Sequence, residues 1–369
     1  MSRPTKIIID LAAIRANCQL AQSLAPHSKT LAVVKADAYG HGAGQVAQAI
    51  EPLVDMLTVT CLEEALDLRQ AGISKPVLLL EGFFTVDEVD LALANDCELV
   101  LHTQRQVIEI LSMTFSQPIR VWLKVDTGMH RLGISAEFAH SVYSMLNDSP
   151  NISQIILMSH FSCADELKNG FTRLQYQSFT ECLELIEYHA GVNKNCIVTS
   201  FANSAAICGW PDYHLDWIRP GLMLYGISPF DTPHTQGDKL LPAMTFSSEV
   251  IAVRHIEAGD SVGYGNTWTA SKPSVIATVA VGYGDGYPRN IKSGAPIIVN
   301  GQRATLVGRV SMDLICVDVT GISDVAIGAD VELWGKNLSV NEVAKWADTI
   351  GYELVTRMPS RVKPSYINE

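Results

Sequence analysis

The chain has 369 residues, 47% of them hydrophobic, and a formal net charge of −12. A chain of this length buries a large core and is long enough for two domains or for a large barrel with an addition. The negative charge argues against a nucleic acid or an anionic membrane surface as the main ligand.

Two further features set the expected compartment. Residues 1–6 lack the apolar core of a signal peptide, and no apolar run approaches the ~18 residues that span a bilayer. The eight cysteines form no CxxC pair, and the ten histidines form no HExxH motif. We therefore expect a cytoplasmic protein with reduced thiols, no metal site and no membrane partner.

The first part of the chain alternates between two patterns. Apolar spacing over residues 10–24 predicts a helix with Asp10 as its N-cap. Beyond it, short apolar runs and helical stretches alternate about eight times, which is typical of a (β/α)8 barrel. The predicted strands are 31–34, 56–59, 76–80, 98–101, 119–125, 155–158, 196–198 and 217–218. The predicted helices include 62–70, 86–94, 104–112 and 174–188.

The pattern changes after Tyr225, where prolines bracket a polar link. We predict a barrel domain over residues 1–232 and a mostly antiparallel β domain over 233–369, with which the first few residues of the chain could pack. Asn300-Gly301 indicates a hairpin turn, and Ser339 could cap a helix over 340–350. The predicted strands are 246–255, 275–281, 296–299, 304–310, 314–319 and 331–334.

One lysine stands out. An apolar run of branched residues ends in Lys35, which opens a glycine-punctuated turn that reaches Gly42. A strand buried on both faces has no favourable place for an ammonium, so Lys35 should lie at its open end, where burial would lower its pKa and make the amine a nucleophile. The simpler interpretation is a lysine that caps the strand and reaches solvent.

Other polar residues also fall at or just past predicted strand ends, which is where a barrel places its chemistry. Each alone could be a satisfied polar residue, but their convergence on one rim favours a site. They are Lys124, Asp126, His160, Ser200, Asn203, Ser204 and Arg219.

Two glycine-rich turns, 262–266 and 281–288, lie in the second part of the chain. Neither opens a helix, and Pro288 closes the second, which argues against a dinucleotide-binding motif. They are either tight turns with a packed tyrosine, or loops that present the hydroxyls of Tyr264 and Tyr283.

The stretch 32–42, AVVKADAYGHG, resembles the pyridoxal-phosphate lysine motif of alanine racemases. Further segments resemble that family's motifs in the same order across nearly the whole chain: 123–133, 202–205, 218–221, 262–265, 282–289 and 308–313. The resemblance implies a barrel followed by a β domain, in agreement with the pattern above.

The resemblance implies pyridoxal 5′-phosphate as cofactor. It makes Lys35 the lysine that forms the internal aldimine, and it places Arg219 at the pyridine nitrogen with His160 behind it. The phosphate would be held by Tyr39, Ser204 and the backbone amides of Gly221 and Leu222. Hydroxyls and free N–H groups are suitable phosphate ligands.

The resemblance also assigns the substrate side. Arg131, joined by the backbone of Met312, would hold the network around the substrate carboxylate, and Lys124 matches a lysine that is carbamylated in many members. Tyr264 would be the second catalytic residue, and Tyr283 would line the entrance, with Asp313 in support beside Met312.

In the family these tyrosines reach the barrel of the other subunit, so the resemblance implies a homodimer with shared active sites. One departure concerns the phosphate. Many members have a tyrosine near the C-terminus that touches it, and Ser360 aligns with that position here.

The resulting hypothesis is a racemase that interconverts L- and D-alanine, with Lys35 and Tyr264 serving opposite faces of Cα. A role in supplying D-alanine for peptidoglycan and a catabolic role both fit. The alternatives are a broader amino-acid racemase, a decarboxylase of basic amino acids, which lacks support because that family's cysteine motif is absent, and a non-catalytic pyridoxal-phosphate carrier. Carriers resemble the barrel alone.

Overall fold

Eight parallel strands close into a barrel in the first part of the chain, as predicted. The structure is a computed structural model that describes residues 3–368. Pairing of β5 with β6 and of β10 with β2 completes the ring, and the short β7 (Ile134–Ser135) pairs in parallel with the end of β6. The barrel strands are β2 (Lys29–Val33), β3 (Met56–Val59), β4 (Val77–Leu79), β5 (Cys97–Leu101), β6 (Ile119–Asp126), β8 (Ile152–Met158), β9 (Val198–Ser200) and β10 (Trp217–Ile218).

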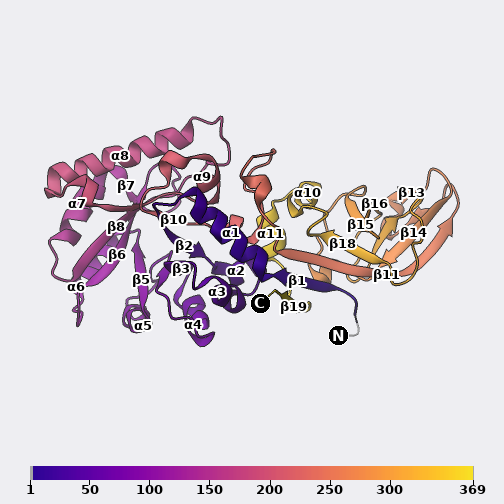
Figure 1. The fold of residues 1–369 in the computed structure, drawn as a ribbon, viewed down its shortest axis with the longest axis horizontal. Helices are drawn as coiled ribbons and strands as arrows, with labels where there is room; N and C mark the ends of the chain where they lie inside the picture. Colours follow the sequence, from indigo (N-terminus) through magenta and orange to yellow (C-terminus); the bar gives the residue numbers. More distant parts are fainter. Residues whose placement is uncertain (1–2, 369) are drawn as a thin grey trace.

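Helices surround this barrel (Figure 1). They are α1 (Leu11–Leu24), α3 (Ala43–Ile50), α4 (Leu62–Gln70), α5 (Glu88–Ala94), α6 (Gln104–Ser112), α7 (Ala136–Asn147), α8 (Phe171–Ala190) and α9 (Ser204–Gly209). The predicted N-cap of α1 is confirmed, because Asp10 accepts hydrogen bonds from the N–H groups of Ala12 and Ala13. No helix within residues 3–368 is long and apolar enough to cross a membrane.

The barrel interior is filled by apolar side chains from alternating strand positions, since strands covered on both faces cannot accommodate polar groups without partners. This interior cluster consists of Leu31, Met56, Leu78, Val100, Trp122, Ile156, Met158 and Trp217. It supports the rim on which the candidate site lies.

The second sheet is antiparallel except for one pair, and β14 also pairs with β11, so the sheet closes on itself. Its strands are β1 (Lys6–Asp10), β11 (Met244–Ile256), β14 (Ser274–Val279), β15 (Pro296–Val299), β16 (Gln302–Val307), β17 (Ile315–Asp318), β18 (Asp330–Trp334) and β19 (Pro364–Ile367). Asn300 and Gly301 join β15 to β16 with φ angles of +46° and +74°, which confirms the predicted hairpin. A small ladder joins β12 (Ser261–Val262) to β13 (Trp268–Thr269).

Both ends of the described chain meet in this sheet. β1 pairs with β11 and, in parallel, with β19, and Figure 1 shows these strands next to the barrel, between it and the rest of the β sheet. The first strand of the chain therefore belongs to the second sheet rather than to the barrel.

Several predicted bounds differ from the structure, and two of the differences have a clear local cause. The strand expected at 196–198 begins at Val198, because Lys194–Cys196 forms a 3-10 turn. The helix expected over 340–350 ends early as α10 (Val340–Trp346), and a separate α11 (Gly351–Thr356) follows. Asp348, at φ +54°, takes the left-handed conformation that interrupts the helix.

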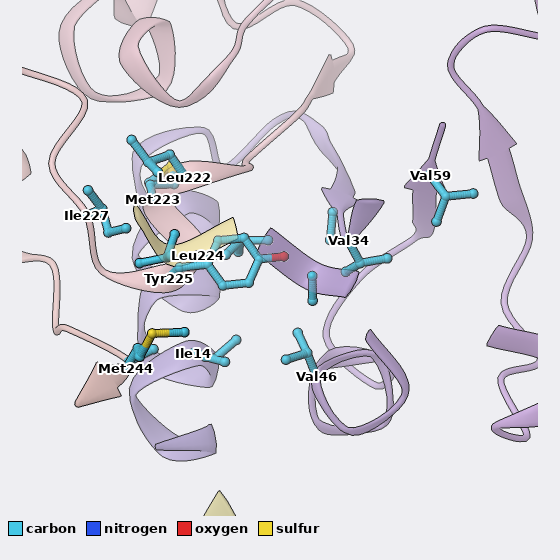
Figure 2. Packing of buried hydrophobic residues seen from close by; sticks show 14 of the residues in the cluster. Ile14, Val34, Val46, Val59, Leu222, Met223, Leu224, Tyr225, Ile227 and Met244 are labelled. Carbon is cyan, nitrogen blue, oxygen red and sulfur yellow. The ribbon is translucent and has the colours of Figure 1, made fainter. Parts of the chain in front are cut away.

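A buried tyrosine joins the end of the barrel to the segment that leads into the β domain. Tyr225 ends the 3-10 turn η3 (Leu222–Tyr225), and its hydroxyl donates to the carbonyl oxygen of Val33 at 2.8 Å. Figure 2 shows its ring among Leu224, Val34 and other apolar side chains. This contact fixes the end of β2, the strand that leads to Lys35.

Candidate active site

A cavity of about 720 Å³ opens at the carboxyl ends of the barrel strands. This volume is typical of small-molecule sites. The structure brings most of the predicted site residues together on its wall: Lys35, Tyr39, Lys124, Arg131, His160, Asn203, Ser204, Arg219, Gly221 and Leu222. Of the other rim residues, Ser200 lies behind Arg219, and Asp126 accepts from the N–H groups of Gly128 and His130 in its own turn.

Lys35 lies directly beyond β2 and opens α2 (Lys35–Gly40), whose backbone is unusual. Ala36, Asp37, Ala38 and Tyr39 all have φ between +52° and +54°, so they form a left-handed turn. Each non-glycine residue in this conformation costs about 1–2 kcal/mol. The surrounding contacts must therefore offset several kcal/mol.

Carboxylates hold this turn at both ends. Glu64 accepts from the N–H group of Ala36 at 2.7 Å, and Asp37 accepts from the N–H group of Ala43, also at 2.7 Å. The ring of Tyr39 stacks on Tyr225 with centroids 4.9 Å apart. The lysine is therefore presented from a fixed backbone rather than from a mobile loop.

The environment of Lys35 favours a neutral amine. Burial lowers its pKa, the nearby Arg131 lowers it further, and Glu81 and Glu64 oppose the shift. A lysine with a lowered pKa can act both as a nucleophile and as a base near neutral pH.

Arg219 is buried and is held in place by hydrogen bonds from Nη1 and Nη2. It donates to Ser200 Oγ and the carbonyl of Ser159, both at 2.6 Å, and to the carbonyl of Phe201 at 3.1 Å. Its Nη2 also lies 3.3 Å from Nδ1 of His160. Burial lowers the Arg219 pKa to about 10, so the guanidinium remains charged at neutral pH.

Since a guanidinium only donates, Nδ1 of His160 must be the acceptor in that contact. Burial, followed by Arg219, lowers the pKa of His160 well below its ordinary value, which keeps the ring neutral. Gln175 donates to the carbonyl oxygen of His160 at 3.1 Å and fixes the backbone there.

A cradle of hydroxyl and amide groups lies at another side of the cavity. Ser204 Oγ accepts from the N–H groups of Gly221 at 3.0 Å and Met223 at 3.3 Å. A Cβ on Gly221 would lie 2.9 Å from the Tyr39 hydroxyl, so only glycine leaves this space free. Two hydroxyls and the start of the η3 turn suit a phosphate group, and the cradle fits pyridoxal phosphate.

Lys124 lies in β6, close to three other cationic side chains. Burial, then Arg219, Arg131 and Lys35, lower its pKa to about 8, while Glu81 raises it. A substantial fraction of the amine is therefore neutral at mildly alkaline pH, which is the form that can react with carbon dioxide.

The remaining predicted residues lie outside the cavity of their own chain. Tyr264, Tyr283 and Met312 are 69%, 41% and 54% exposed, and none of them lines the cavity. The neighbouring β13 lies at the end of the molecule opposite the barrel (Figure 1).

Ion pairs and a backbone hydrogen bond fix these exposed loops. Gly284 donates to the carbonyl oxygen of Met312 at 2.9 Å. The fully buried Asp285 pairs with Arg3 at 2.7 Å and with Arg361 at 3.3 Å, and Arg361 pairs with Asp313 at 2.6 Å. Arg361, in the C-terminal segment, thus supports the loop of Met312 through its ion pair with Asp313.

The sequence interpretation missed several residues on the cavity wall, among them Glu81, His102, Tyr352 and Thr356. Glu81 and His102 come directly after β4 and β5, and the strand-end rule would have found them. Tyr352 and Thr356 belong to α11, and no local pattern places that helix at the barrel. Ser360 is exposed and does not line the cavity.

Solved structures share this arrangement over the whole chain. The crystal structure of the biosynthetic alanine racemase from Pseudomonas aeruginosa has a TM-score of 0.93 at 42% identity, covering 99% of this chain and 100% of that one. The alanine racemase from Acinetobacter baumannii has a TM-score of 0.92 at 38% identity, with 99% and 100% coverage. The fold and cavity therefore define a pyridoxal-phosphate-dependent isomerase of the amino-acid racemase class.

Sequence comparison identifies the family. The alanine racemase N-terminal domain matches residues 9–229, and the alanine racemase C-terminal domain matches residues 243–366. The chain is 50% identical to the alanine racemase of Pseudoalteromonas atlantica over the full length of both proteins. It belongs to the alanine racemase family, as the motif resemblance predicted.

Proposed function

We propose that this protein interconverts L-alanine and D-alanine with bound pyridoxal 5′-phosphate, using Lys35 and Tyr264 as its two acid–base groups. The observation that carries the proposal is Lys35 in a cationic cavity that also contains the Tyr39–Ser204–Gly221 cradle. When bound, the cofactor withdraws electron density from Cα of the amino acid and so makes its proton removable.

Each residue then has a task. Lys35 carries the cofactor and exchanges the proton on one face of Cα, with the lowered pKa that both tasks need. Arg219 would donate to the pyridine nitrogen, and His160, which accepts from Arg219, would orient it. Tyr39, Ser204 and the amides of Gly221 and Leu222 would bind the phosphate, since all four residues line the cavity.

Racemisation also needs a proton donor on the opposite face. Because Tyr264 is exposed and outside the cavity of its own chain, the second face would be served by Tyr264 of the partner subunit in a homodimer. Tyr283 and Met312 would line the same entrance from that subunit. The alanine carboxylate would lie against Arg131, supported by Lys124 in its carbamylated form.

We place the enzyme in the cytoplasm, where its product would supply peptidoglycan synthesis. The sheet with its exposed Tyr264 loop distinguishes this protein from a non-catalytic carrier, since a carrier has no use for a second proton donor.

Deuterium exchange at Cα, followed by NMR in heavy water across a panel of amino acids, tests the proposal. The protein with pyridoxal phosphate should exchange and invert alanine, more slowly serine, and basic amino acids not measurably. Lys35→Ala should reduce alanine exchange by at least about 10³-fold, since it removes both the covalent link and a base.

Alanine exchange at the parent rate in Lys35→Ala would refute the assignment of Lys35. Faster exchange with serine than with alanine would favour the broader racemase.

A further inference from the structure

The helix α11 brings two side chains that carry hydroxyl groups to the cavity wall from outside the barrel. Tyr352 and Thr356 both line the cavity and are four residues apart, so they share one face of the helix. Leu354 and Val355 are buried and anchor the other side of α11. The helix, which belongs to the C-terminal part of the chain, therefore holds these two side chains at the cavity wall.

The approach of α11 depends on Gly40, the last residue of α2. A Cβ on Gly40 would overlap the carbonyl oxygen of Val355, so glycine allows the two backbones to touch. As a result, the ring of Tyr352 packs on Tyr39 with centroids 6.0 Å apart. Tyr39 in turn lies beside Gly221 in the cradle.

The C-terminal segment beyond α11 leads away from the cavity. Arg361 is tied to Asp285 and Asp313, which keeps Ser360 out of the cavity. The position that aligns with the tyrosine of other members thus has neither the side chain nor the location to reach the phosphate.

We propose that Tyr352 and Thr356 of α11 complete the phosphate site of the cofactor by donating their hydroxyls to the phosphate oxygens. This inference rests on the proposed function, since it concerns the phosphate of bound pyridoxal phosphate. A phosphate dianion accepts several hydrogen bonds, and hydroxyl donors on the open side of the cradle would complete its coordination. Burial raises the pKa of Tyr352, so its hydroxyl stays protonated and available as a donor.

The test compares two ligands. The cofactor-free full-length protein is titrated with pyridoxal 5′-phosphate and with pyridoxal, which lacks the phosphate, and binding is followed by the absorbance of the lysine-linked cofactor. Tyr352→Phe and Thr356→Val should each weaken pyridoxal phosphate binding by about 10- to 100-fold, the usual effect of one hydrogen bond to a charged group. Binding of pyridoxal should stay unchanged.

The variants contain their own controls. Tyr352→Phe keeps the ring that packs on Tyr39, Thr356→Ser keeps the hydroxyl and should bind as the parent does, and Ser360→Ala should have no effect. Unchanged affinity for pyridoxal phosphate in Tyr352→Phe and Thr356→Val would overturn the inference. Equal weakening of both ligands would also overturn it, because that result assigns Tyr352 and Thr356 a packing role.

Failure of the proposed function would look different. In that case neither ligand would give the absorbance of a lysine-linked cofactor in the parent protein, and the variants at Tyr352 would behave in the same way.

Discussion

Lys124 is a cavity residue whose lowered pKa has a measurable effect on stability. Its side chain is buried beside Arg219, Arg131 and Lys35, and its pKa falls from 10.5 to about 8. In the unfolded chain the same lysine keeps a pKa near 10.4. Between these values the unfolded state binds more protons, so the free energy of unfolding rises with pH in that window. The charged lysine destabilises the fold fully below pH 8, and the destabilisation fades toward pH 10.5.

Lys124→Met should remove this dependence. The difference in the free energy of unfolding between variant and parent should shrink by about 2 kcal/mol from pH 7 to pH 9.5, because only the parent gains as the amine loses its proton. Urea unfolding in carbon-dioxide-free buffer measures it, and ionisable groups that do not interact with Lys124 cancel in the difference.

If the difference in the free energy of unfolding stays constant over this pH range, the neighbours of Lys124 do not lower its pKa. Added bicarbonate should stabilise the parent above pH 8 and leave Lys124→Met unaffected, since a carbamate forms only on a neutral amine.

At the scale of elements, the left-handed turn of α2 and the helix α11 depend on each other. The turn holds four consecutive non-glycine residues at positive φ, and it is stable because Glu64, Tyr225 and α11 pack around it. Gly40 is the point of closest approach between the two elements.

Gly40→Ala should therefore destabilise the protein far more than a glycine change in open space. Gly72 is the matched control, since its φ of +85° is also left-handed but a Cβ there meets nothing within 4 Å. Gly72→Ala should cost about 1 kcal/mol, whereas Gly40→Ala should cost about 2–3 kcal/mol more because of the overlap with Val355. Thermal and urea unfolding of both variants measure the two effects.

Equal destabilisation in the two variants would mean that α11 does not press against the turn. A loss of pyridoxal phosphate affinity in Gly40→Ala alone would tie this contact to the cofactor site.

Local periodicity predicts some elements of this chain well, whereas α2 and α11 depend on contacts that a sequence does not show. The bounds of β3, α4 and α6 were predicted residue for residue, because local periodicity determines them. The handedness of α2 was not predicted, since alanine and tyrosine give no local signal for positive φ. The role of α11 was also missed, because its place depends on contact with residues more than 300 positions away in the chain. Glu81 and His102, in contrast, followed the strand-end rule and were simply overlooked.

The whole molecule separates the groups that its proposed reaction requires. Lys35 lies in the barrel cavity, whereas Tyr264 is exposed and lies outside that cavity, in a loop next to β13 at the far end of the β sheet. One chain alone therefore offers a proton donor on one face of the substrate only. A homodimer in which each chain supplies Tyr264 to the barrel of the other resolves this, since a two-fold interface supplies both sites equally.

Mixing two inactive variants tests this central claim most directly. Lys35→Ala and Tyr264→Phe each disable both sites of their own homodimer, but a hybrid dimer contains one site with Lys35 from one chain and Tyr264 from the other. An equal mixture should recover about one quarter of the parent racemase activity, since half of the dimers are hybrids with one intact site each. Native mass spectrometry verifies that subunits have exchanged. No recovery in a mixture that demonstrably contains hybrid dimers would contradict the shared active site.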